Sequence, residues 1–172
     1  MKSLLLAVLL SAAAGIAAWV HGSPQLQHRD DTSAAITRYV SAEDNDFADL
    51  KGKLQRSNSS SAYFASLQAL PGSNACVIYV NDDAGAHFGG CTFDAANLND
   101  AGALYRRWLE NVKSAVPQWR RIDLTRMPPG DVAATIFTDA SQVHMIVVDI
   151  FNDPQLGYRV DTTFSKASVL RS

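Results

Sequence analysis

The two cysteines are the residues whose spacing gives the most definite chemistry. Cys76 and Cys91 are the whole cysteine content of this 172-residue chain. Between them, residues 81–85 (NDDAG) have the composition of a tight turn. A hairpin that turns between Asp83 and Ala84 places the two cysteines opposite each other, about 4.5–5.5 Å apart at Cα, which a disulfide can bridge. The spacing therefore predicts a Cys76–Cys91 disulfide in an oxidising compartment.

Cys91 has a second interpretation, as a nucleophile. It follows Gly89 and Gly90, and His144 and Asp149 lie on a later predicted strand. A thiolate nucleophile needs a base within hydrogen-bond reach and a group that orients the base. This order of residues resembles that of papain-like exported peptidases, which implies a thiol hydrolase with Cys91 as nucleophile and His144 as base. The Asp-Cys-Ser-Gly type of motif is absent, and the strand period places Asp149 on the opposite face from His144.

A basic segment with tryptophans is the third candidate. Residues 106–126 contain six basic and two acidic side chains, together with Trp108 and Trp119. Arginine and tryptophan are typical anchors of protein interfaces. Trp108 falls in the apolar stripe of a predicted helix and is expected in the core. The alternative to a binding role for the arginines is that they lie on a solvated face and pair with acidic side chains of the N-terminal half. The predicted binding residues, for a protein partner of acidic character, are Trp119, Arg120, Arg121 and Arg126.

Export is predicted by the first residues. Lys2 precedes an uncharged apolar run, residues 4–20, that ends in small side chains, which is the layout of a signal peptide. The run is slightly shorter than the roughly 20 residues of a membrane-spanning helix, and no second run is long enough. We expect a periplasmic or extracellular protein with a signal peptide at residues 1–22, a flexible leader at residues 23–32 and one domain at residues 33–172.

Charge and motifs exclude several function classes. The chain has 15 basic and 17 acidic residues, and loss of Lys2 with the signal peptide leaves a net charge of −3. This balance does not favour nucleic-acid binding. Phosphate-loop, nucleophile-elbow, zinc-protease and dinucleotide signatures are absent. We therefore expect no cofactor, no metal, no nucleic acid and no membrane contact after signal cleavage.

The N-terminal part of the domain is predicted to be helical. A short helix is expected around residues 36–40. Phe47, Leu50 and Leu54 fall at i, i+3 and i+7, which predicts an amphipathic helix. Tyr63, Phe64, Leu67 and Leu70 predict a second helix, which Pro71-Gly72 ends.

The remainder alternates strands with one strong helix. Residues 76–80 and 87–93 predict a hairpin. Asn99 or Asp100 is the predicted N-cap of a helix that ends at Pro117, with Leu104, Trp108, Val112 and Ala115 on its apolar face. Residues 119–126, 132–138, 143–151 and 158–164 predict four strands, whose short links favour an antiparallel meander.

These elements predict the α+β class, with no internal repeat in the sequence. The expected sheet is antiparallel, made of the N-terminal hairpin and the four-strand C-terminal meander, with helices packed on one face. The predicted function is a small exported non-enzymatic domain that binds another protein, as an inhibitor, an immunity-type protein or an effector. The alternative is the thiol hydrolase that uses Cys91 and His144. Asn58-Ser59-Ser60 is also an N-glycosylation sequon, relevant in a eukaryotic source.

Overall fold

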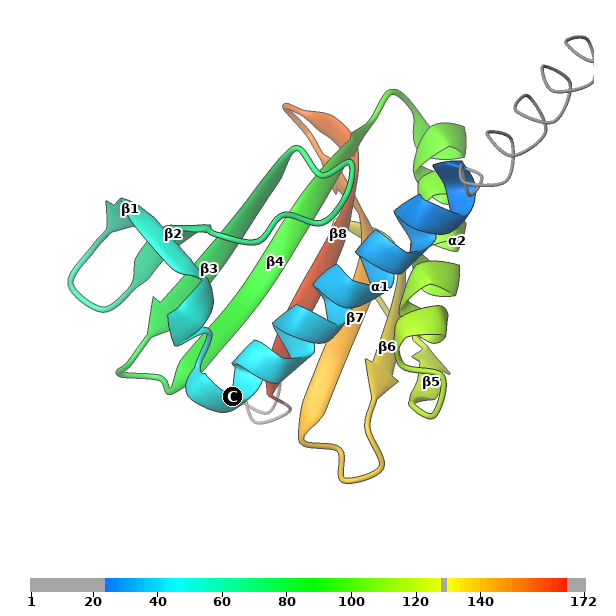
Figure 1. The fold of residues 1–172 in the computed structure, drawn as a ribbon. Helices are drawn as coiled ribbons and strands as arrows, with labels where there is room; N and C mark the ends of the chain where they lie inside the picture. The colour runs from blue at the N-terminus through cyan, green and yellow to red at the C-terminus, as the bar shows by residue number, and fades with distance from the viewer. Residues whose placement is uncertain (1–23, 128–129, 167–172) are drawn as a thin grey trace, which may run out of the picture.

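Two helices lie against an eight-stranded antiparallel sheet in the computed structural model, which describes residues 24–127 and 130–166 (Figure 1). The strand order is β1-β2-β3-β4-β8-β7-β6-β5. The predicted α+β class and antiparallel sheet are confirmed, although the sheet has eight strands where six were expected. The predicted signal peptide, residues 1–22, lies outside the described residues.

The element bounds show two helices, two short 3-10 turns and eight strands in the described part of the chain. The helices are α1 (Pro24–Ala42) and α2 (Leu98–Ala115), and the 3-10 turns are η1 (Glu43–Asn45) and η2 (Ala48–Leu50). The strands are β1 (Lys51–Ser57), β2 (Ala62–Ser66), β3 (Ala75–Asn81), β4 (Ala86–Ala95), β5 (Arg120–Asp123), β6 (Asp131–Thr138), β7 (His144–Asp153) and β8 (Gly157–Lys166).

The element order repeats. Each half of the chain is a helix followed by a four-strand antiparallel meander, α1 with β1–β4 and α2 with β5–β8. The last strands of the two halves, β4 and β8, pair antiparallel and join the meanders into one sheet. The outermost strands are therefore the first strand of each half, β1 and β5.

The prediction of two helices over residues 47–70 is wrong. Asp46 and Phe47 have φ values of 55° and 59°, in the left-handed region, so the chain leaves its helical path before η2. After η2 the chain extends as β1 and returns as β2, with Leu54 opposite Phe64. The apolar pattern that suggested a helix covers too few residues to exclude strands. Residues 58–61 form the hairpin turn between β1 and β2.

Helix α1 is longer than predicted. It begins at Pro24, and proline is well suited to a first helical position because it lacks the amide hydrogen. Residues 24–32, expected in the flexible leader, therefore belong to the helix. Ile36 and Tyr39 are completely buried, and the Tyr39 ring stacks on Phe164 of β8 with centroids 4.6 Å apart.

The predicted helix is present as α2, and Trp108 and Val112 of its apolar face are buried. It begins two or three residues earlier than expected, because the side chain of Asn97 caps it by accepting a hydrogen bond from the backbone N–H of Asp100. Trp108 is 1% exposed and its ring contacts Phe93 of β4 with centroids 4.6 Å apart. The helix contacts α1, β4, β7 and β8. No helix of the described residues is both long and apolar enough to cross a membrane.

Side chains alternate between the two faces of the sheet. Val148, Ile150 and Val160 are buried in the core beside the helices. Their chain neighbours, including Asp149 and Asp161, point to the opposite face. On that face Tyr63, Tyr79 and Phe88 form a row of contacting rings across β2, β3 and β4.

Candidate functional site

All four predicted binding residues lie in or near β5, at one edge of the sheet. β5 ends the strand order and pairs with β6 alone, and it contains Arg120 and Arg121. Trp119 directly precedes β5, and Arg126 follows it by three residues. The three arginines are exposed. We call Arg120, Arg121 and Arg126 the basic edge.

Backbone groups of β5 point away from the sheet. The amide of Leu124 donates to the carbonyl of Ala134 at 3.0 Å, in line with the β5–β6 register. Hydrogen-bonded pairs alternate along an antiparallel ladder, so Ile122 and Arg120 also face β6. The backbone N–H and C=O of Arg121 and Asp123 consequently point outward, where a further strand would pair.

A hydrogen-bond chain holds Arg121 in place. Arg121 Nε donates to Asp123 Oδ1 at 2.9 Å, and the Thr135 hydroxyl donates to the same oxygen at 2.6 Å. These two hydrogen bonds, that from Thr135 first, hold the pKa of Asp123 below its usual value. The Tyr105 hydroxyl of α2 donates in turn to Thr135 at 2.6 Å. The chain links α2, β6 and β5 and fixes the orientation of the guanidinium.

Arg120 and Arg126, unlike Arg121, have no acidic partner among the described residues. No ion pair within residues 24–127 and 130–166 involves either side chain. Trp119 is only partly exposed and packs against the hydrophobic core. It therefore supports the start of β5 more than it offers a free aromatic surface. The charge that the edge presents comes from the arginines.

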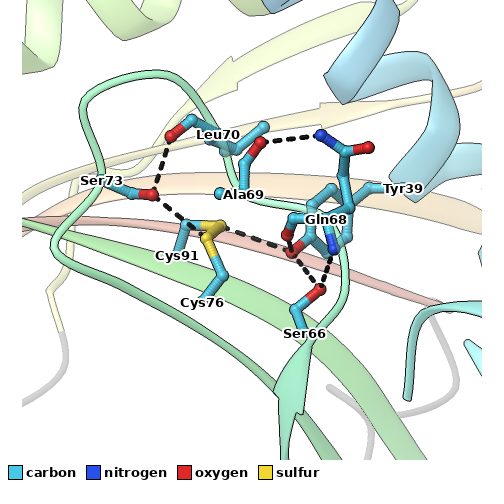
Figure 2. Close-up of a disulfide and its surroundings, with 8 residues drawn as sticks. All are labelled: Tyr39, Ser66, Gln68, Ala69, Leu70, Ser73, Cys76 and Cys91. Carbon is cyan, nitrogen blue, oxygen red and sulfur yellow. Dashed lines mark hydrogen bonds between the residues drawn. A yellow bond between two sulfur atoms is a disulfide. The ribbon is translucent and has the colours of Figure 1, made fainter. Parts of the chain in front are cut away.

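The predicted disulfide is present. Cys76 and Cys91 are directly opposite in the β3–β4 register and their sulfurs are bonded, as Figure 2 shows. Tyr39 reaches this bond from α1: its hydroxyl lies 3.5 Å from Cys91 Sγ and donates to the carbonyl of Gln68 at 2.6 Å. Burial raises the pKa of Tyr39 to about 12. The disulfide thus lies beneath α1 and the segment that joins β2 to β3.

The structure does not bring Cys91 and His144 together. Cys91 is opposite Thr162, which is opposite Val148, four residues along β7 from His144. At about 3.3 Å per residue this offset is about 13 Å. Neither cysteine has a free thiol. The hydrolase alternative requires a free thiolate with a base beside it. In this arrangement Cys91 is in a disulfide and His144 is far from it.

His144 instead joins a buried acid that the sequence analysis missed. His144 Nδ1 lies 2.8 Å from Glu43 Oε2, and its Nε2 lies 3.6 Å from Asp44. The Glu43 side chain is 0% exposed, and its Oε1 has no hydrogen-bond partner among the residues that the structure describes. Burial, then the charge of Asp44, raises the pKa of Glu43 to about 9 despite Lys166 nearby. Because Glu43 follows α1 and His144 begins β7, only tertiary structure could reveal this pair.

A second unusual carboxyl group lies on the opposite face of the sheet. Asp149 of β7 is directly opposite Asp161 of β8. Burial, then the charges of Asp161 and Asp131, raises the pKa of Asp149 to about 7. Arg159 donates to Asp161 at 2.9 Å and partly offsets this repulsion. Burial also raises the pKa of Asp161, so two facing carboxyl groups on the last two strands both have raised pKa values.

A metal site is not evident in the described segments. Within residues 24–127 and 130–166, no group of three or more His, Cys, Asp or Glu side chains is placed to hold a metal ion. One shallow hollow of about 260 Å³ lies beside the β1–β2 turn and is lined mainly by serine, asparagine and aspartate residues. The basic edge remains the best-defined candidate for binding.

Comparison with known proteins gives no further assignment. No protein-family model matches the chain, and no curated protein or solved structure is similar to it.

Proposed function

We propose that this chain is an exported, non-enzymatic domain that binds another protein through the basic edge. The partner contributes an extended, acidic segment that adds to the sheet beside β5. The single observation that carries this proposal is the coincidence of an unpaired strand edge with two arginines, Arg120 and Arg126, that have no ion-pair partner within the described residues.

The geometry supports strand addition. Outward N–H and C=O groups at Arg121 and Asp123 supply main-chain hydrogen bonds to an incoming strand, as in other proteins that extend a sheet with a peptide. β5 has only four residues, so the main-chain contribution is small. Side-chain charge must therefore provide much of the affinity and the selectivity.

The charge pattern supports an acidic partner. Arg120 and Arg121 are neighbours on β5 and point to opposite faces of the sheet. An added strand with carboxylates at alternate positions presents them on one face, where they can pair with Arg120. Arginine is suited to this role because its planar guanidinium binds a carboxylate through two hydrogen bonds. Steering by such charges raises association rates and makes binding sensitive to salt.

Charged edge strands also have a purely protective role, because they prevent edge-to-edge aggregation. The second edge strand allows the two roles to be separated. β1 also presents exposed cationic side chains, Lys53 and Arg56. If the arginines of β5 only prevent aggregation, charge reversal at either edge should have the same consequence.

The test is a binding measurement with a labelled synthetic peptide of alternating glutamate and valine. We expect saturable binding that weakens with added salt, and loss of binding when backbone N-methyl groups block pairing. The variant Arg120→Glu/Arg126→Glu should weaken binding by about tenfold or more, about 1.4 kcal/mol. Its thermal stability should change by less than about 0.5 kcal/mol, because both side chains are exposed and unpaired.

The matched control is Lys53→Glu/Arg56→Glu, which makes the same change of charge at the other edge. It should bind the peptide as the unsubstituted protein does. Equal loss in both double variants would show a general electrostatic effect and would contradict the assignment to β5. Binding of a lysine-containing version of the peptide with equal affinity would also overturn the proposal.

A further inference from the structure

The loop between β1 and β2 contains the only Asn-X-Ser/Thr sequence of the chain, at Asn58-Ser59-Ser60. The three residues are exposed. The loop lies at the left of Figure 1, at the edge of the sheet opposite to β5. It borders the shallow polar hollow described above. Because the three residues are exposed, a large polar group attached here would extend into solvent.

The conformation of the loop leaves one atom of Asn58 available. Asn58 Oδ1 accepts hydrogen bonds from the backbone amides of Ser60 at 3.0 Å and Ser61 at 2.7 Å, and from the Ser61 hydroxyl at 2.9 Å. Because amide N–H groups require an acceptor, these contacts fix which end of the side chain is the oxygen. Nδ2 points away with no hydrogen-bond partner in the described structure, and the Ser60 hydroxyl lies 3.5 Å from Oδ1.

We propose that Asn58 is the acceptor for an N-linked oligosaccharide. The step joins Nδ2 to the anomeric carbon of a sugar carried on a lipid pyrophosphate. The sugar–pyrophosphate bond breaks, the pyrophosphate leaves with the electron pair, and one amide proton passes to a base of the transferase. The inference rests on the export part of the proposed function, because the chain must enter a secretory compartment. The Cys76–Cys91 disulfide fits the same oxidising route.

The modification would protect one edge of the sheet and leave the other free. Asn58 directly follows β1, whose outer side has no strand partner. Leu54 on β1 is 48% exposed, and Leu67, close to Gly52 of β1, is 68% exposed. Exposed apolar side chains on an unpaired strand promote association between copies. A bulky, hydrated glycan beside β1 would oppose that association without covering β5.

The experiment is expression of the full chain with its own leader in a eukaryotic secretory host, followed by intact mass measurement of the secreted protein. We expect a heterogeneous mass above that of the polypeptide, removed by peptide-N-glycosidase with conversion of Asn58 to aspartate. The variants Asn58→Gln and Ser60→Ala should both lose the added mass. Ser61→Ala keeps the sequon while it removes one hydrogen bond to Oδ1, and it should retain the glycan.

Failure of this inference can be separated from failure of export. If the chain's own leader does not direct export, the same chain fused to the leader of a secreted protein of the host tests the site. Secreted protein with the unmodified polypeptide mass, from cells that glycosylate a co-expressed control, would overturn the assignment. For the protective role, Asn58→Gln should scatter more light at high concentration than the glycosylated protein. Equal scattering would overturn that role.

Discussion

Glu43 and His144 are 101 residues apart in the chain and share a hydrogen bond of 2.8 Å. Glu43 follows the last turn of α1, and His144 is the first residue of β7. The pair therefore fastens the end of the first helix to the second meander. The Glu43 side chain is 0% exposed, and one of its oxygens has no hydrogen-bond partner within the described segments. Its ionisation therefore costs free energy, and a protonated carboxyl that donates to Nδ1 avoids that cost.

The first prediction concerns pH and Glu43. Its pKa rises from 4.5 to about 9 on folding, so its contribution to stability is complete below pH 4.5 and is lost as pH rises towards 9. The slope is at most about 1.4 kcal/mol per pH unit for one group. Chemical denaturation at pH 5 and pH 8 should show higher stability at pH 5. Glu43→Gln cannot ionise and should flatten the difference; an unchanged difference would contradict this role.

The second prediction concerns Asp149. Its pKa rises from 3.8 to about 7, so its contribution is likewise lost as pH rises through 7. Like charges directly opposite on neighbouring strands are destabilising. Asp149→Asn should therefore raise the stability at pH 8 by about 1 kcal/mol, with a smaller effect at pH 5. Thermal unfolding at the two pH values measures this, and equal effects at both would exclude repulsion as the cause.

The third prediction concerns the disulfide. It closes a loop of 15 residues, and the chain-entropy estimate for such a loop is about 3 kcal/mol. The double variant Cys76→Ala/Cys91→Ala should lose about that stability in denaturant unfolding. Added reductant should destabilise the unsubstituted protein and leave the variant unchanged. A variant that responds to reductant in the same way would show that the effect lies elsewhere.

The fourth prediction compares two adjacent glycines of β4. A Cβ on Gly89 would lie 2.9 Å from ring atoms of Tyr39, whereas a Cβ on Gly90, on the opposite face, meets nothing closer than 3.6 Å. Gly89→Ala should cost about 1–3 kcal/mol, because α1 must shift away from the sheet. Gly90→Ala should fold with nearly unchanged stability. Similar losses in the two variants would mean that backbone freedom, not contact with Tyr39, is what glycine provides.

Local sequence patterns were enough to predict most helices and strands in the second half of the chain. The apolar face of α2 and the short polar links between β5, β6, β7 and β8 require only neighbouring residues to specify them. The Cys76–Cys91 pairing was equally predictable, because the turn between the two strands sets their register. The arginines of β5 were identified from composition, although their place on a free edge was not.

Tertiary contacts decided the secondary structure of residues 47–70 and the positions of the buried acidic side chains. Residues 51–57 and 62–66 form β1 and β2 because pairing with β3 extends the sheet, while a few apolar residues at ambiguous spacing do not by themselves select helix or strand. The joining of the two meanders through β4 and β8, and the contact of Glu43 with His144, depend on partners far away in the chain. The sequence alone determined the helices and strands that local periodicity and turn residues control. Packing between distant segments decided the β1–β2 hairpin and the buried acidic contacts, because a short stretch of chain does not encode which distant segment will pack against it.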